Sequence, residues 1–425
     1  EYSANAADLK DCYLLFNSNE GEDSAYGNGI DASKHCYDNS HLQNCERCYE
    51  SFWLTRCYDT HFSAQCEDCV SVWFSKNCQG CTNCFGCVNL RNKSYYFFNE
   101  PLSKDEYMQK VTELQLSSHS SLESLKEKVR LFWLRFPVKY TNGIKNFSCT
   151  GEYITHSKNV RDSYLVREGE DLAYVQYGQV PPFRDSMDTI VGGMNSELVY
   201  ESSTCGWNSS QIRFCWECWD GGVDFEYSMF CRGTSHVFGS VGIHGGEYII
   251  LNKQYSKEEF YELRDEIHRH MDAMPYFDAQ GRKYGYGEHF PPEFSPFAYN
   301  DSIAAEHFPL SKEDILVYGG KFYETPRTEY ETSVDAQQLP DVIHDAPEET
   351  VKELIACQHC KKAYRIIAPE LQFLKQNNIP LPRYCVDCRH TNRIAQRNKS
   401  FLHERSCMCD KEGHGHVGVC LHTFK

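Results

Sequence analysis

The chain has 425 residues, an apolar content of 41% and an aromatic content of 14%, which exclude a wholly disordered protein and predict two to four domains. Its formal net charge is −17, yet residues 351–425 carry 13 Lys and Arg against 6 Asp and Glu. No stretch approaches the roughly 18 apolar residues of a membrane span. We therefore expect an acidic body with a basic tail and no membrane span.

Cysteine usage points to a compartment. The chain has 23 cysteines, and many of them form C-x-x-C pairs. In so large a chain such pairs are commoner for metal ligands or reduced thiols than for a disulfide framework. We expect a cytoplasmic or virion protein. Secretion stays open, because the sequence begins with Glu1 rather than Met.

Residues 1–102 are predicted to form a first cysteine-rich β-helix block. Short aromatic and polar runs alternate there with turn residues, and cysteines recur at a constant interval. Repeats this short must stack to bury a core, so we predict a parallel β-helix with about 21 residues per rung. Two cysteine series should then stack in lines: Cys36, Cys57 and Cys78, and Cys45, Cys66 and Cys87.

A second, larger repeat predicts an internal duplication. Phe85-Gly86 matches Phe238-Gly239, and Ser103-Lys104 matches Ser256-Lys257, so the two copies differ by a constant 153 in residue number (238 − 85). The fold class is therefore mainly β with α: a duplicated parallel β-helix solenoid with capping helices and a C-terminal zinc ribbon. The predicted segments are block 1 (1–102), a helical insert (103–148), block 2 (149–255), a helix with an aromatic, Pro-rich strap (256–350) and the basic zinc-ribbon tail (351–425).

Helix starts carry the S-x-x-E capping-box pattern, in which side chains satisfy free backbone groups. Ser103 with Glu106, Ser120 with Glu123, and Ser256 with Glu259 fit it. We predict helices over about 104–115, 121–136 and 257–273, and a further start at Ser311.

The duplication also bears on the role of the block 1 cysteines. Cys45-x-x-Cys48 and Cys66-x-x-Cys69 fit a zinc template, but buried thiols also pack as small apolar groups. At the offset of the duplication three of the block 1 cysteines are replaced, which packing tolerates and a ligand set does not. Reduced, stacked thiols are favoured, and metal or disulfide bonding stays open. The replaced cysteines are Cys81, Cys84 and Cys87, which meet Thr234, Val237 and Ser240.

The tail predicts a zinc site. Cys357-x-x-Cys360 and Cys385-x-x-Cys388 have the spacing of two knuckles that present four thiolates to one tetrahedral ion. Four protein ligands leave no open position, so the ion should be structural. A second, weaker site is predicted further on, against the alternative of His-rich tail chemistry. Its ligands would be Cys407, Cys409, His416 and Cys420.

Motifs for phosphate binding, hydride transfer and nucleophilic catalysis are missing. We therefore expect a non-enzymatic protein. Two alternatives to a structural or interaction role stay open. A carbohydrate-active β-helix enzyme would use an acidic groove built from Asp162, Asp171, Asp185, Asp188, Asp220 and Asp224, although aspartates in turns are the plainer interpretation. A nucleic-acid-associated factor would use a basic patch built from Arg383, Arg389, Arg393, Arg397 and Arg405.

Several phrases carry a family resemblance: "CTNCFGCVNLRNKSYYFFNEPLSKDEY", "EYIILNKQYSKEEF", "FSPFAYNDSIAAEHFPLSKED" and "CQHCKKAYRIIAPELQFLKQNNIPLPRYCVDCRH". Nearly the whole chain resembles a family of cysteine-rich repeat proteins that end in a zinc ribbon, from metagenomes of candidate-phylum bacteria and their phages. The resemblance implies this architecture and a second ribbon continuing past Lys425, rather than a reaction. We expect a structural or interaction protein with protein partners, and with nucleic acid as a further partner of the basic tail.

Overall fold

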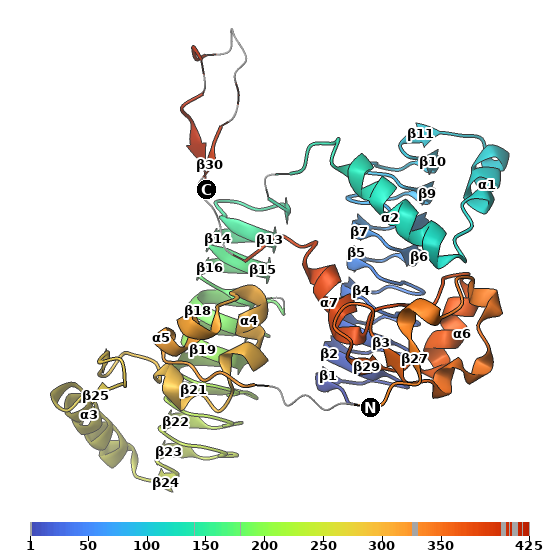
Figure 1. Ribbon diagram of the computed structural model, residues 1–425. Helices are drawn as coiled ribbons and strands as arrows, with labels where there is room; N and C mark the ends of the chain where they lie inside the picture. The colour runs from blue at the N-terminus through green and yellow to red at the C-terminus, as the bar shows by residue number, and fades with distance from the viewer. Residues whose placement is uncertain are drawn as a thin grey trace. The chain divides into compact units, whose positions relative to one another are not determined.

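The computed structural model describes residues 2–139, 141–178, 180–324, 330–400, 405–407, 409, 415–418 and 420–424. The chain divides into two compact units, each made of two stretches. The first unit comprises residues 1–138 and 327–397, and the second comprises residues 139–326 and 398–425. Both are built around parallel strands, so the chain is mainly β with helices, as predicted (Figure 1).

We call the parallel strands of residues 4–97 the first ladder. They form two sheets, β1-β2-β3-β4-β5-β7 and β10-β9-β8-β6, and every parallel pair joins residue i to residue i+12, as in Phe52 opposite Ala64 and Tyr58 opposite Val70. The strands are β1 (Ala4–Ala7), β2 (Tyr13–Asn19), β3 (Ala25–Asp31), β4 (Ser40–Gln43), β5 (Phe52–Thr55), β6 (Tyr58–His61), β7 (Ala64–Glu67), β8 (Val70–Trp73), β9 (Thr82–Phe85) and β10 (Ser94–Phe97).

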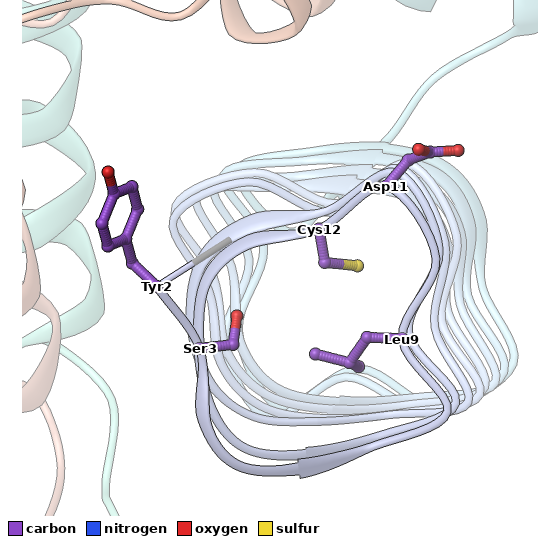
Figure 2. A pocket seen from close by; sticks show the side chains of 5 residues that line it. All are labelled: Tyr2, Ser3, Leu9, Asp11 and Cys12. Carbon is purple, nitrogen blue, oxygen red and sulfur yellow. The ribbon is translucent and has the colours of Figure 1, made fainter.

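A three-residue period runs along the first ladder. Leu42, Cys45, Cys48 and Ser51 are buried inside it, and the residue before each has left-handed backbone geometry, which lets the chain turn a corner every three residues. Figure 2 shows the same alternation at the first turn: Ser3, Leu9 and Cys12 point into the interior, and Tyr2 and Asp11 point away from it. Four such triplets make one 12-residue turn.

The predicted length of the rung is therefore wrong. Both 21 and 12 are multiples of three, so cysteines spaced by 21 all face the interior, but on different walls. Cys57 lies in register with Cys45 and Cys69, since Glu46 pairs with Tyr58 and Tyr58 with Val70. The 21-residue spacing of the cysteines thus reflects the three-residue period of the inward positions. It does not give the number of residues in one turn, which is 12.

The second ladder, residues 143–250, is a larger parallel arrangement whose offset is not constant. Gly143 pairs with Ile154 (i to i+11), and Gly169 pairs with Phe183 (i to i+14). In its longest strands, β18 and β19, Phe183 pairs with Ser196 (i to i+13). The strands are β12 (Gly143–Ile144), β13 (Gly151–Thr155), β14 (Lys158–Arg161), β15 (Ser163–Arg167), β16 (Gly169–Ala173), β17 (Gln176–Gly178), β18 (Phe183–Gly193), β19 (Ser196–Gly206), β20 (Ser209–Arg213), β21 (Gly222–Glu226), β22 (Ser235–Phe238) and β23 (Glu247–Ile250).

Each ladder ends in a short antiparallel return and a helix. β10 pairs with β11 (Glu100–Pro101) before α1 (Lys104–Glu113), and β23 pairs with β24 (Lys253–Gln254) before α3 (Lys257–Ala273). The predicted capping boxes of Ser103 with Glu106 and Ser256 with Glu259 are both formed. This repeated ending matches the predicted duplication offset.

The remaining helices agree with the sequence less closely. α2 (His119–Trp133) begins two residues before the predicted start, because Ser118 rather than Ser120 caps it by accepting from the Ser121 N–H. Ser311 caps α5 (Lys312–Tyr318), as expected. The segment between α3 and the tail contains β25 (Tyr276–Phe277), β26 (Lys283–Tyr284), η1 (Pro292–Phe294), η2 (Tyr299–Asp301), α4 (Ile303–His307), β27 (Val334–Asp335), η3 (Ala336–Gln338), η4 (Ile343–Asp345) and η5 (Glu348–Lys352).

An outer core covers one wall of the first ladder. Tyr37, Tyr49 and Phe62 lie on this wall and belong to one apolar cluster with Leu125 of α2 and Phe373 of α6 (Ala368–Gln376). The Phe373 ring lies 4.7 Å from that of Tyr37 and 6.0 Å from that of Tyr49, centroid to centroid. The cysteine-rich tail is thereby held against the ladder within the first unit.

No helix among the described residues is long and apolar enough to cross a membrane.

Candidate metal centre

The first pair of predicted ligands lies in a short hairpin. β28 (Ile355–Ala356) and β29 (Ala363–Tyr364) are antiparallel, and the turn between them carries Cys357 and Cys360. The Cys357 N–H donates to the Lys362 carbonyl at 2.9 Å, and the Lys361 N–H donates back to the Cys357 carbonyl at 3.1 Å. Lys361 has a φ of +61°, so this knuckle closes with a left-handed residue.

The second pair lies at the start of a helix. Cys385 is the N-cap residue of α7 (Val386–Ile394), and Cys388 lies in the first turn of that helix. The Arg389 N–H donates to the Cys385 carbonyl at 2.9 Å, which fixes the turn. The Gln358 N–H donates to the Arg383 carbonyl at 3.0 Å and ties the hairpin to the segment before α7.

The four sulfur atoms converge. The Sγ atoms of Cys357, Cys360, Cys385 and Cys388 all lie within 4.8 Å of one another. The Cys357–Cys388 distance is 3.9 Å and the Cys360–Cys385 distance is 3.6 Å. Tetrahedral zinc with Zn–S bonds of about 2.3 Å requires sulfur atoms about 3.8 Å apart. The predicted quartet is therefore close enough to hold a metal ion, and its geometry fits zinc.

The electrostatics of the quartet favour a thiolate at Cys357. Burial opposes its ionisation, but backbone N–H groups of Cys385, Cys360 and His359 donate to the sulfur and lower the pKa of Cys357 to about 7. One of these bonds, from the Cys385 N–H to the Cys357 Sγ, is 3.2 Å long. Burial raises the pKa of Cys385 to about 11. A cation that enters would displace protons from such thiols.

Helix α7 is anchored on the first ladder by buried ion pairs. Arg393 is 1% exposed, and its guanidinium donates to the Asp38 carboxylate at 2.9 Å and to the Tyr26 carbonyl at 3.2 Å. Arg389 donates to the same Asp38 carboxylate and, at 2.7 Å, to that of Glu370. Asp38 and Glu370 are fully buried, so removing either partner would leave a charge without compensation.

This network removes part of the possible basic patch from the surface. Arg383, Arg389 and Arg393 are all buried, and Arg383 donates to the carbonyls of Leu339 and Pro340 at 2.9 Å. Arg397 is half-buried, and the side chain of Arg405 lies outside the described part of the chain. Three of the five arginines therefore stabilise the first unit internally instead of facing a nucleic acid.

The second, weaker metal site stays a prediction. β30 (Arg405–Ser406) pairs with β31 (Thr423–Phe424), and backbone bonds join Cys407 to His422 and Cys420 to Cys409. Among the described residues, however, only the quartet at Cys357 brings three or more potential ligands within 4.8 Å. The sequence predicts Cys407, Cys409, His416 and Cys420 as ligands; the neighbouring His414 lies outside the described residues.

The six aspartates of the possible acidic groove do not share one environment. All six have left-handed backbone geometry, with φ between +45° and +68°, so they occupy the corner positions of the turns. Asp224 is buried, and the other five are exposed. Asp224 accepts from Arg213 at 2.8 Å, from Arg264 at 3.0 Å and lies 3.1 Å from His236. These contacts tie α3 to the second ladder.

Sequence reasoning missed the buried acids of the first unit. Asp38 stands at a turn corner and Glu370 in a short helix, and each resembles an ordinary surface residue in the sequence. Arg389, which binds both, is 351 positions from Asp38 and 19 from Glu370. The one available signal was the excess of Lys and Arg over Asp and Glu in a tail that accompanies an acidic body.

Comparison with known proteins adds little. No family model matches the chain, and no curated protein matches it. Among solved structures, a putative acetyltransferase from Desulfovibrio desulfuricans G20 is similar at 8% identity and a TM-score of 0.13. The match covers 60% of this chain and 68% of that one.

Proposed function

We propose that this chain is a non-enzymatic structural or interaction protein of a cellular or virion assembly. In this proposal the two ladders are parallel β-helix solenoids that present rigid, repeated surfaces, and a structural zinc ribbon docks a protein partner. The observation that best supports this proposal is the four-cysteine cluster. Helix α7, at the start of which two of the cysteines lie, is fixed to the first ladder by Arg389 and Arg393. A site closed by four protein thiolates supports a structural ion, because no ligand position is left for substrate.

Repetition on the outer surface supports the presenting role. Residues i and i+12 lie side by side on successive turns, so like positions form columns. Lys10, Glu22 and Lys34 make one such column, with Lys–Glu distances of 2.5 and 2.6 Å. A regular spacing of side chains along a stiff wall suits lateral contacts with a partner.

The zinc assignment is tested by metal analysis of the purified full chain. We expect one tightly held zinc per chain, lost in a Cys357→Ser variant, with amide exchange increasing over residues 355–394. Cys215→Ser in the second ladder is the matched control and should keep its zinc. Unchanged zinc in the Cys357→Ser protein would remove the ribbon from the proposal.

The non-enzymatic part is tested on polysaccharides. The chain should leave acidic and neutral polysaccharides uncleaved, with or without added divalent ions. Turnover that is abolished by Asp188→Asn or Asp224→Asn would replace the presenting role with the enzyme alternative.

A further inference from the structure

The interior of the first ladder holds stacked thiols. All ten cysteines from Cys36 to Cys87 are buried to 2% exposure or less. At the 12-residue offset Cys36 stacks on Cys48, and Cys66 stacks on Cys78. We call these ten residues the thiol column.

The longest line in the column has four members. Cys45, Cys57, Cys69 and Cys81 occupy the same inward position on four successive turns, because Glu46 pairs with Tyr58, Tyr58 with Val70 and Val70 with Thr82. Neighbouring strands of a sheet lie about 4.8 Å apart, so successive thiols of this line are one strand spacing apart.

Packing alone does not require this composition. Ser51, Ser63 and Ser75 occupy inward positions of the same ladder, and Leu54 and Val72 occupy others. The second ladder fills most of its interior with Val, Ile, Leu and Phe, and three of its buried cysteines, Cys205, Cys218 and Cys231, stack in a shorter line. The turn geometry therefore accepts several small side chains, whereas a line of stacked sulfurs arises only from cysteine.

We propose that the thiol column of the first unit is a binding site for the soft monovalent ion Cu(I). Thiolates select soft ions, and Cu(I) accepts low coordination numbers, so pairs of neighbouring thiols suffice. Zinc would need four sulfurs within mutual reach, which among the described residues only the ribbon supplies.

Charge balance also favours a monovalent ion. Each Cu(I) that enters displaces one proton from a thiol, and the resulting thiolate bridges to the next ion, so no net charge and no oxidant are required. A divalent ion with four thiolates would leave net negative charge inside an apolar core, which is costly. A linear run of bridging sulfurs is the arrangement that a neutral copper–thiolate chain needs.

Entry requires only local opening. Each wall of the ladder is a single strand thick, and backbone hydrogen bonds join it to the next turn, such as the bond from the Val70 N–H to the Cys81 carbonyl at 3.0 Å. Opening one turn exposes its thiols without unfolding the others.

The test uses the full, reduced, zinc-loaded chain under nitrogen. Cu(I) is titrated in against bathocuproine disulfonate, and bound copper and the emission of solvent-shielded copper–thiolate clusters are measured. We expect several Cu(I) per chain and strong emission. A Cys357→Ser/Cys360→Ser variant removes the ribbon as a copper site and should keep most of both signals.

The discriminating variant is Cys69→Ser/Cys81→Ser, which removes half of the longest line of stacked thiols and substitutes a residue that the ladder already uses at inward positions. It should lose at least half of the bound copper and weaken chelator competition about tenfold or more. Cys149→Ser, at a half-buried thiol of the second unit that is not part of the stacked line of Cys205, Cys218 and Cys231, is the control and should change neither. If the ribbon variant binds no copper, or the Cys69/Cys81 variant binds as much as the unchanged chain, the proposal is overturned.

Discussion

The two ladders follow the same plan with different interiors. In the first, every parallel pair joins residues i and i+12, and the interior is mostly Cys and Ser with a few Leu, Ile and Val. In the second, the offset varies between 11 and 14 residues along the ladder, and Phe183 and Phe225 are buried inside. The number of residues per turn thus varies where larger side chains fill the interior.

Steric detail explains this difference. A Cβ atom at Gly192 would lie 2.6 Å from the Phe183 ring, and one at Gly222 would lie 2.7 Å from the Phe225 ring. The Phe183 ring therefore requires a neighbouring position without a side chain, and at Gly222 the Thr234 carbonyl oxygen, 1.9 Å from the added Cβ atom, excludes a side chain together with the Phe225 ring. In the 13-residue turns the additional residue sits at a corner with two successive left-handed residues, such as Trp207 and Asn208. An interior filled by small residues needs neither these glycines nor the additional corner residue.

The largest effect should come from a charge placed inside the regular ladder. Cys57→Asp buries an unpaired carboxylate between Cys45 and Cys69 and should destabilise the first unit by on the order of 4 kcal/mol. Chemical denaturation, followed by amide exchange resolved along the chain, measures the loss. Tyr58→Asp, one residue away and 43% exposed, should cost less than about 1 kcal/mol. Equal losses would contradict the inward position of Cys57.

A large cavity is the next test, in the second ladder. Phe183 is fully buried, so Phe183→Ala should cost about 3–5 kcal/mol in the free energy of unfolding of the second unit. Phe183→Leu refills most of the volume and should recover at least half of that loss. A loss below about 1 kcal/mol for the alanine variant would show that the ring does not support its turn.

Removing one sulfur should matter much less. Cys57→Ala deletes a single heavy atom from the first interior and should cost about 1 kcal/mol. The comparison with Phe183→Ala therefore measures how far each interior depends on individual side chains. A loss as large as that of Phe183→Ala would mean that the Cys57 thiol contributes more than packing.

The smallest effect concerns pH. Burial raises the pKa of Glu370 although the Arg389 guanidinium opposes the shift. A carboxyl whose folded-state pKa is raised contributes stability that is full below its unfolded pKa and is lost as pH rises through the folded pKa. Glu370→Gln should therefore weaken the gain in stability of the first unit between about pH 7 and pH 4.5. Thermal unfolding at both values, with Glu348→Gln as an exposed control, decides this.

Local chemistry was predictable from the sequence, and the turn length was not. The capping boxes at Ser103 and Ser256 and the quartet of Cys357, Cys360, Cys385 and Cys388 depend on residues close in sequence or on doubled C-x-x-C pairs. The 12-residue turn is set by how four triplets close, which no single residue type marks. Cysteine is the inward residue that is easiest to recognise in the sequence. Its 21-residue spacing suggested a turn longer than 12 residues.

Ion pairs between residues far apart in the sequence explain the other features that the sequence did not predict. Asp38 meets Arg389 and Arg393 only because the tail folds back over one wall of the ladder. Nothing near Asp38 in the sequence distinguishes it from the other corner aspartates. Three of the five arginines of the possible basic patch are buried for the same reason: charge counts give no information on which charges are buried.

The antiparallel returns β11 and β24 have a consequence for self-association. The last parallel strands, β10 and β23, would otherwise offer free N–H and C=O groups on which another copy could extend the sheet. In each case two residues fold back onto that edge, and a capped helix follows. Fibre growth from these two edges is therefore blocked within the chain itself, by two residues and a capped helix in each case.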